Sequence, residues 1–240
     1  MSSTNKKIAI IGGGVAGLLA AVTAADAGAK VSLFEKMPKV GLKMGITGKG
    51  RCNLTNSAPI MDFIGKTPGN GKFLYSAYEA FSNEDLLDLL HSYGLVTKVE
   101  RGGRVFPASD DAQEVRHLFM KLLRDKKVDL HLEEPVSHIV VIDGEAKGVV
   151  TAKGRYDTNA VILCTGGASY PRTGSTGDGY RMAKEVGHKV TTIRPALIPL
   201  VCQEDWCKEL QGLSLKNVTL SLDGGGRRKG EEFGEMLFTH

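Results

Sequence analysis

The stretch "KKIAIIGGGVAGLLAAVTAADAGAKVSLFEK" near the N-terminus constrains the fold more than any other part of the sequence. An apolar run over 8–11 leads into three glycines, an Ala- and Leu-rich segment covers 18–27, and a second apolar run covers 31–34. Short apolar runs are typical of strands buried in a parallel sheet, and Gly28 stands where a helix would end. The order strand, glycine turn, helix, strand predicts the first unit of a doubly wound α/β fold.

The glycines of this turn have the spacing of a dinucleotide-binding fingerprint. Gly12 would permit the tight turn, Gly14 would let the backbone approach a pyrophosphate, and Gly17 would let helix and strand pack closely. The free N–H groups and the positive end of the helix dipole would hold the phosphates. Glu35, at the end of the second strand, can accept both hydroxyls of an adenosine ribose and would repel a 2′-phosphate. We therefore expect FAD or NAD rather than NADP.

Composition narrows the class of protein and its partners. The 240 residues, 42% hydrophobic and 24% charged, can form one large domain or one and a half. The net charge is +4, and we interpret the compact basic run at 227–229 as a hairpin tip, so we expect no nucleic-acid partner. Glycines 12–14 interrupt the uncharged segment 8–25, so we expect neither a membrane span nor a signal peptide.

The cysteines indicate neither a disulfide framework nor a metal site. They stand at 52, 164, 202 and 207, without a CxxC pair or neighbouring histidines that would complete a zinc set. We expect free thiols, no bound metal and a cytoplasmic location.

The segment after Glu35, "KMPKVGLKMGITGKGRCNLTN", does not begin the next helix at once, as a nicotinamide-binding unit usually would. A loop that leaves the end of the second strand passes beside the pyrophosphate. Its glycines allow close contact, Arg51 can fork onto phosphate oxygens, and Lys43 and Lys49 add positive charge. We interpret the segment as a cofactor cradle that favours FAD, with a purely NAD-linked dehydrogenase as the alternative.

The middle of the chain predicts two further helices and several antiparallel strands. Helices are expected over 82–95 and 110–127, with a hairpin around Gly102-Gly103 between them. Alternating residues after 127 predict a small meander with turns at 143–144 and 153–154, followed by a buried strand over 160–164.

The segment 164–190, "CTGGASYPRTGSTGDGYRMAKEVGHKV", begins directly after that buried strand. Thr165 and Gly166 open a glycine turn at the carboxyl end of the strand, where α/β sheets bind ligands. We expect Asp178 to cap a helix over 179–186 and interpret Tyr170 as a packing residue.

The cradle segment and the segment 164–190 together resemble the bacterial FAD-dependent oxidoreductases that include aminoacetone oxidase-like and bile-acid dehydro-reductase-like proteins. These belong to the glutathione-reductase-type flavoproteins with two dinucleotide domains, and the resemblance covers essentially the whole chain. It implies an FAD-dependent oxidoreductase acting on a small molecule, with NAD(P)H as a candidate electron donor. It also implies that Gly50, Arg51 and Asn53 lie along FAD, that a backbone group near Val136 contacts the adenine, and that the turn at Thr165 closes over the cofactor.

These arguments give one set of candidate cofactor-binding residues. They are Gly12, Gly14, Val15, Ala16, Gly17, Glu35, Lys36, Lys43, Gly50, Arg51, Asn53, Val136, Thr165 and Gly166. No side chain stands out as a catalytic acid or base. We interpret Cys52 as a small buried residue beside the cofactor, because no nearby cysteine could resolve a reactive thiol.

The sequence changes character near residue 193. Strands expected over 214–222 and 235–239 flank a glycine-rich basic turn. We expect residues 1–192 to form a Rossmann-like FAD-binding domain of the α/β class with a small β-meander, and residues 193–240 to begin a second, β-rich substrate domain. The resemblance implies the N-terminal portion of a longer protein. A non-catalytic FAD-binding fragment or redox-sensing module stays an alternative, and the oligomeric state is left open.

Overall fold

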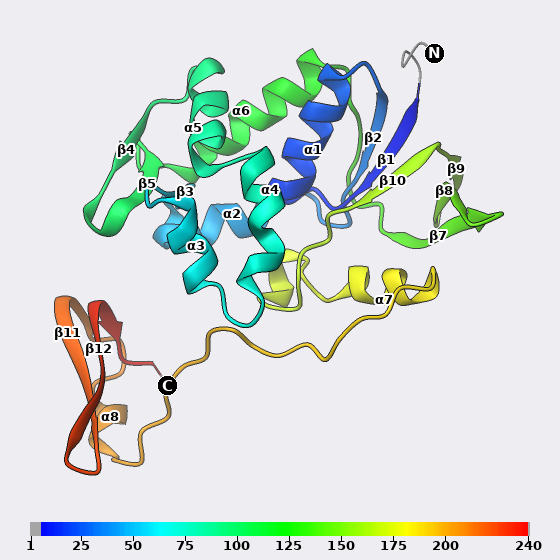
Figure 1. Ribbon diagram of the computed structural model, residues 1–240. Coiled ribbons are helices and arrows are strands. Elements are labelled where there is room, and N and C mark those ends of the chain that lie inside the picture. Colours follow the sequence, from blue (N-terminus) through cyan, green and yellow to red (C-terminus); the bar gives the residue numbers. More distant parts are fainter. Residues whose placement is uncertain (1–5, 240) are drawn as a thin grey trace. The chain divides into compact units, whose positions relative to one another are not determined.

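The computed structural model describes residues 6–239, which divide into two compact units (Figure 1). The first unit extends to Thr192 and the second begins at Ile193. None of the described helices is both long enough and apolar enough to cross a membrane.

A parallel sheet of four strands forms the centre of the first unit. Its order is β10-β1-β2-β6, with bounds Ala160–Leu163, Lys7–Ile11, Lys30–Phe34 and Asp129–His131. The three strands expected from the apolar runs are confirmed to within one residue at each end. The edge strand β6 is new, because the sequence pattern assigned its residues to the meander.

Two helices cover one face of this sheet (Figure 1). They are α1, Val15–Asp26, and α6, Ala112–Asp125. Ile10 and Leu33 of the strands pack with Leu18 of α1 and Val115 of α6 in one buried cluster. Helix α1 begins earlier than expected, because Gly14 in an extended conformation serves as its N-cap.

The antiparallel meander and helix α7 bury the other face of the sheet. The meander consists of β7, Val136–Ile142, β8, Glu145–Thr151, and β9, Gly154–Asp157, and α7 spans Asp178–Glu185. Ala9, Ile11 and Phe34 point to this side and pack with Val149 and Met182. Successive side chains of β1 therefore enter opposite cores, which explains its continuous apolar run.

One capping prediction for α7 is wrong. Gly177, with a φ of 85°, is the N-cap residue, and Asp178 is the first residue of the helix. The Asp178 carboxylate is instead bonded to Lys36, so it is not free to cap the helix.

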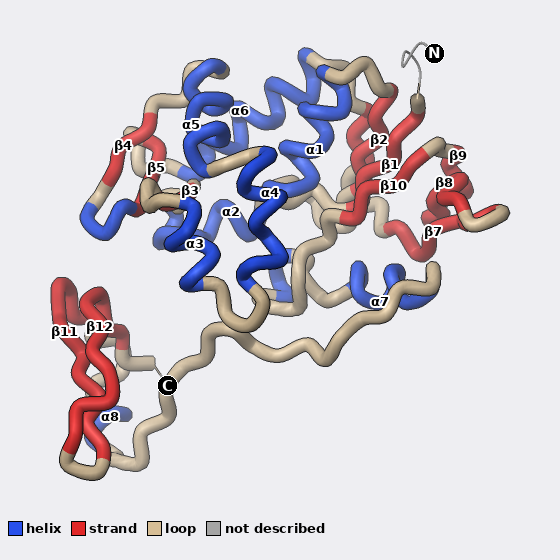
Figure 2. Tube along the Cα trace, in the orientation of Figure 1, coloured by secondary structure: helices blue, strands red, loops and turns tan. Residues whose placement is uncertain are grey.

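An insertion between β2 and β6 carries four short helices and a small antiparallel sheet (Figure 2). The helices are α2, Leu42–Ile46, α3, Ile60–Lys66, α4, Tyr75–Ala80, and α5, Asn83–Ser92. The sheet has the order β3-β5-β4, with bounds Thr55–Asn56, Arg104–Pro107 and Thr97–Val99. The hairpin expected around Gly102-Gly103 is confirmed. The segment expected as an open loop contains α2 and a 3₁₀ turn over Thr47–Gly50.

The second unit contains helix α8, Trp206–Glu209, and the hairpin of β11, Ser214–Gly224, with β12, Arg227–Leu237. The basic run at 227–229 begins β12, so its expected place at the hairpin tip is wrong. The tip is Gly225-Gly226, both with positive φ (63° and 75°). A two-residue turn needs that conformation, and glycine adopts it most readily.

Candidate cofactor site

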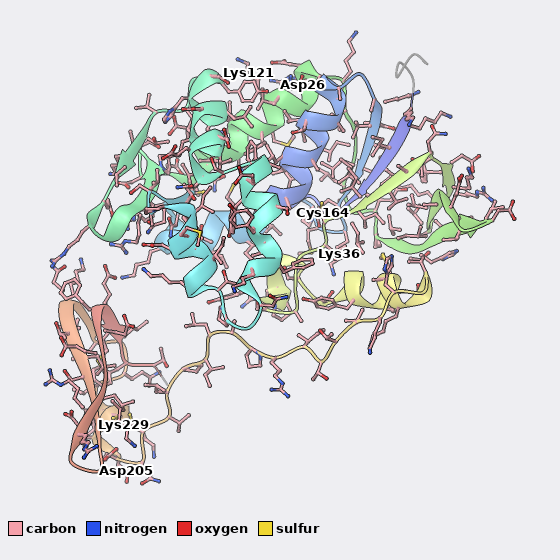
Figure 3. The ribbon with its side chains drawn as sticks, in the orientation of Figure 1. Asp26, Lys36, Lys121, Cys164, Asp205 and Lys229 are labelled. Carbon is pink, nitrogen blue, oxygen red and sulfur yellow. The ribbon has the colours of Figure 1, made fainter. Side chains whose placement is uncertain are left out.

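A cavity of about 710 Å³ lies at the carboxyl ends of β1, β2 and β10. The glycine turn after β1, Glu35 after β2 and Thr165 after β10 all line it. Lys36, directly after Glu35, and Cys164, directly after β10, are labelled in Figure 3, and both line the cavity. Ligands of doubly wound sheets bind at this end of the strands.

The glycine turn has little room on one side and open space on the other. A Cβ atom at Gly12, whose φ is 106°, would lie 2.4 Å from the carbonyl oxygen of Cys164. A Cβ atom at Gly17 would lie 1.9 Å from the carbonyl oxygen of Gly12. At Gly14, a Cβ atom would meet nothing within 4 Å, and Gly14 lines the cavity. Two glycines therefore allow close packing, while the third leaves open space for a ligand.

The N-terminus of α1 faces the same cavity. Val15 and Ala16 line it, and the N-cap residue Gly14 has no side chain that could bond the first amides of the helix. The first turn of the helix also carries no acidic residue. Unpaired amides and the positive end of the helix dipole suit a phosphate group, so this end of the cavity fits a dinucleotide.

Glu35 fixes the geometry of the turn as well as lining the cavity. Its Oε2 accepts a hydrogen bond from the Gly13 amide at 2.7 Å, and its Oε1 accepts one from the Met37 amide at 2.8 Å. Each carboxylate oxygen can accept a second bond, so the side chain keeps the capacity to bind a ribose. The bond to Gly13 was not expected from the sequence.

Two lysines from the chain after β2 line the cavity and reach the segment that follows β10. The Lys36 ammonium lies 2.6 Å from Asp178 Oδ2 and 2.6 Å from the Thr176 hydroxyl. The hydrogen bond from Lys36 lowers the pKa of Asp178 below its usual value. Lys43 donates to the carbonyl oxygen of Ser169 at 2.8 Å.

The cavity includes most of the predicted site residues but not all of them. Asn53, Val136 and Gly166 join those already described. Gly17, Gly50 and Arg51 do not line it. The Arg51 guanidinium lies 2.8 Å from Glu100 Oε1 instead, so the expected fork onto phosphate oxygens has no support in the structure.

Cys52 lines the cavity as a buried thiol, with 2% of its surface exposed. Burial raises its pKa to about 11, although a hydrogen bond with Thr47 acts in the opposite direction. The thiol is therefore protonated at neutral pH and is a poor nucleophile. Neither a disulfide nor a group of three metal-binding side chains occurs among residues 6–239.

Sequence reasoning missed Glu134, which lines the cavity beside Val136. Its side chain is only 2% exposed. It accepts hydrogen bonds from Thr151 at 2.8 Å, Tyr156 at 2.7 Å and Lys153 at 2.7 Å. Burial raises its pKa, but these bonds outweigh that effect and lower the value to about 2. Glu133 and Glu134 are adjacent in the sequence, so no local pattern distinguishes the buried one.

A glycine turn, an uncapped helix N-terminus and a carboxylate at a strand end surround one cavity, which defines a Rossmann-type dinucleotide-binding domain. Residues 6–229 match the family described as the HI0933-like protein Rossmann domain. The chain belongs to this FAD-binding family, which confirms the family resemblance and the choice of FAD over NAD.

Curated relatives share about a third of the residues or fewer. The chain is 35% identical over 240 residues to the 3-dehydro-bile acid delta(4,6)-reductase of Clostridium scindens, across 97% of this chain and 56% of that protein. It is 28% identical over 240 residues to the ribosomal RNA dihydrouridine synthase of Escherichia coli, across 96% of this chain and 56% of the relative. The chain therefore spans little more than half the length of these relatives.

Solved structures share the fold at lower identity. The open conformation of a flavocytochrome c3 fumarate reductase has a TM-score of 0.61 and 23% identity, and covers 90% of this chain and 47% of its own. The 3-ketosteroid-delta4-(5alpha)-dehydrogenase of Rhodococcus jostii has a TM-score of 0.57 and 16% identity, and covers 79% of this chain and 55% of its own.

Proposed function

We propose that the chain is the FAD-binding part of an oxidoreductase that reduces a small organic substrate. The observation that carries the proposal is that one cavity combines open space at Gly14, the N-terminus of α1 and the Glu35 carboxylate. These groups suit the pyrophosphate and the adenosine ribose of a dinucleotide. Bound FAD supplies a carrier of two electrons, while the protein supplies binding and orientation.

The remaining candidate residues receive roles along the same cavity. A backbone group near Val136 would contact the adenine, at the start of the meander. Lys43, Asn53, Thr165 and Gly166 line the cavity and would hold the rest of the cofactor. Lys36 would act by holding the segment after β10, since its ammonium is bonded to Thr176 and Asp178.

We infer a reductive reaction and a small substrate from the curated relatives. The relative at 35% identity is named a reductase of a bile acid. Residues 193–240 would begin a β-rich substrate domain, and free thiols support a cytoplasmic location. NADH or NADPH would supply the electrons.

A ribosomal RNA substrate is the second candidate, because a relative at 28% identity is named a ribosomal RNA dihydrouridine synthase. The net charge of +4 and the short basic run at 227–229 favour the small molecule. The two candidates predict different substrates for the same flavin.

Purification followed by an absorbance spectrum, with chromatography of the released cofactor, tests the cofactor. We expect FAD and no tightly bound nicotinamide. Anaerobic reduction with NADH or NADPH, followed by mixing with either an unsaturated 3-oxo bile acid or a uridine-containing RNA, tests the reaction. Flavin reoxidation by the bile acid alone supports the proposal, whereas reoxidation by RNA alone favours the second candidate. A protein that binds FAD but is not reduced by either donor would be a binding module.

A further inference from the structure

We propose that Arg51 is a positioning residue that fixes the turn 47–53 from outside the cavity and does not contact the cofactor. The proposal rests on the proposed FAD site, because Thr47, Cys52 and Asn53 of this turn line the same cavity. Arg51 itself does not line it.

The turn has a backbone that needs to be held in place. Gly48, Lys49, Gly50 and Cys52 have φ values of 57°, 59°, 91° and 65°. This left-handed conformation is unfavourable for residues with a Cβ atom, such as Lys49 and Cys52. Strained conformations persist only where the surrounding structure imposes them.

The Arg51 side chain joins the turn to itself and to strand β5. Its Nε donates to the carbonyl oxygen of Gly48 at 3.1 Å, while the Cys52 amide donates to Thr47 at 3.1 Å. The guanidinium lies 4.2 Å from the centre of the Phe106 ring, which is 1% exposed. A Cβ atom at Gly48 would lie 2.6 Å from the same ring, so the turn rests directly on β5.

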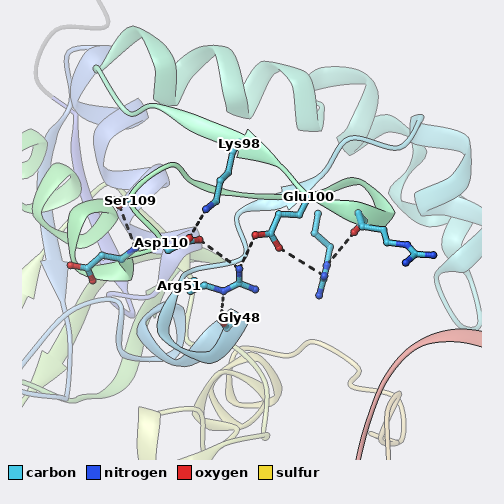
Figure 4. Close-up of polar contacts among 9 residues, drawn as sticks. Gly48, Arg51, Lys98, Glu100, Ser109 and Asp110 are labelled. Atoms are coloured by element: carbon cyan, nitrogen blue, oxygen red, sulfur yellow. Dashed lines mark hydrogen bonds and ion pairs between the residues drawn. The ribbon is translucent and has the colours of Figure 1, made fainter. Parts of the chain in front are cut away.

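Two carboxylates hold the guanidinium from the β4–β5 region (Figure 4). Its Nη1 lies 2.8 Å from Glu100 Oε1 and 3.6 Å from Asp110 Oδ1. Lys98 is in turn bonded to Asp110, and Arg104 lies 3.9 Å from Glu100. The result is a row of alternating charges, Lys98, Asp110, Arg51, Glu100 and Arg104, in which Arg51 of the turn lies between two carboxylates from the β4–β5 region.

These ion pairs disfavour the binding of a phosphate by Arg51. A phosphate would have to replace two carboxylates that already neutralise the guanidinium, one of which, Glu100, also accepts a hydrogen bond from it. The bonds of Arg51 therefore hold the turn in place. The turn thereby positions Thr47, Cys52 and Asn53, which line the cavity.

Two measurements on the whole chain separate positioning from phosphate binding. The first is the rate at which N-ethylmaleimide labels Cys52, measured by peptide mass spectrometry on the protein without FAD. The second is the dissociation constant of FAD, measured by quenching of flavin fluorescence. The variants are Arg51→Ala, Arg51→Lys and Glu100→Ala, with circular dichroism and a thermal melt to show that each is folded.

If Arg51 positions the turn, Glu100→Ala reproduces Arg51→Ala. In both variants N-ethylmaleimide should label Cys52 about tenfold faster, and FAD should bind about tenfold more weakly, since each substitution removes a hydrogen bond to a charged group. Arg51→Lys should have an intermediate effect, because lysine keeps the charge but not the fork. Arg155→Ala is the matched control, since it removes an exposed arginine paired with Asp157 at 2.7 Å in β9. It should change neither quantity.

The opposite pattern would overturn the proposal. If Arg51 binds phosphate, removal of Glu100 frees its guanidinium, so Glu100→Ala would bind FAD as tightly as the parent or more tightly. Labelling of Cys52 would then stay unchanged in all variants. If the parent protein binds no FAD, the proposed function fails, but the labelling rates still decide the role of Arg51. If Arg51→Ala does not fold, Glu100→Ala and Arg51→Lys provide the same comparison.

Discussion

Gly14 and Gly17 belong to the same glycine motif, but the absence of a side chain matters for a different reason at each position. At Gly14 the missing side chain leaves space in the cavity, with the backbone in an extended conformation that any residue can adopt (φ −75°, ψ −178°). At Gly17 the missing side chain lets α1 approach the carbonyl oxygen of Gly12. One position concerns the ligand and the other concerns the fold.

Substitutions at these two positions should therefore separate binding from folding. Gly14→Val should abolish FAD binding and cost at most about 1 kcal/mol of stability, the typical size of an N-cap effect. Gly17→Ala should destabilise the fold by about 1–3 kcal/mol, because the added methyl group overlaps backbone. Thermal melts and flavin spectra of the two purified variants measure both effects. A yellow Gly14→Val protein would contradict the assignment of the pyrophosphate to this space.

Replacement of Glu35 should also weaken cofactor binding. Glu35→Ala should weaken FAD binding by about 1.5–3 kcal/mol, the range for a hydrogen bond to a charged group. The Gly13 and Met37 amides also lose their acceptor, so the turn becomes less well ordered. Calorimetric titration with FAD gives the change, and Glu35→Gln, which retains one acceptor oxygen, should lose less. Equal flavin retention by Glu35→Ala and the parent after dialysis would refute the ribose assignment.

At the scale of elements, a buried polar cluster joins the meander to the edge of the parallel sheet. Glu134, on the connection from β6 to β7, bonds to Thr151 of β8, Tyr156 of β9 and Lys153 between them. The His131 ring of β6 stacks on Phe34 of β2 with ring centres 4.5 Å apart. The cluster fixes the place where β7, and with it Val136, begins.

The lowered pKa of Glu134 makes a signed prediction about acid stability. Its carboxylate is favoured in the folded state, with a pKa of about 2 against 4.5 for an ordinary glutamate. The stabilisation is present above pH 4.5 and is lost as the pH falls from there towards 2. Glu134→Gln should be about 1–3 kcal/mol less stable at pH 7 and should show a flatter loss of stability below pH 4.5. Urea unfolding at several pH values measures both, and parallel pH profiles of variant and parent would contradict the prediction.

At the scale of the whole molecule, the chain between the two units offers a protease an easy substrate. Residues 186–205 form neither helix nor strand, and Leu197 and Val201 are 94% and 93% exposed. Proteases cleave exposed irregular segments in preference to packed elements. The segment contains Lys189, which trypsin recognises, whereas the bond after Arg194 precedes Pro195 and resists trypsin.

Brief trypsin treatment should therefore cut the chain first after Lys189, since Val190 follows it. The larger fragment should keep its FAD, because every residue that lines the cavity precedes residue 183. Mass spectrometry identifies the cut, and gel filtration with flavin detection shows which fragment carries the cofactor. A first cut within residues 6–185, or release of flavin upon cleavage after Lys189, would argue against an independently stable first unit.

The features that depend on near neighbours are predictable from the sequence alone. Strand β1, the glycine turn, helix α1, strand β2 and the capped helix α5 follow from periodicity, glycine spacing and capping residues, all of which act over a few positions. The same local pattern indicated the residues of the cavity nearest to the turn, and it indicated that Cys52 is a buried residue rather than a nucleophile.

The pairs that distant charges form depend on the folded structure and were not predicted from the sequence. The sequence predicts Arg51 as a phosphate ligand, whereas in the structure its guanidinium is bonded to Glu100, 49 residues away. Lys36 and Asp178 pair across 142 residues, which removes Asp178 from the cap of α7. Glu134 becomes buried because β8, β9 and the turn between them close over it. Electrostatic and hydrogen-bonding partners depend on distances in space. For residues that are remote in the sequence, those distances are set by the fold and do not follow from a local sequence pattern.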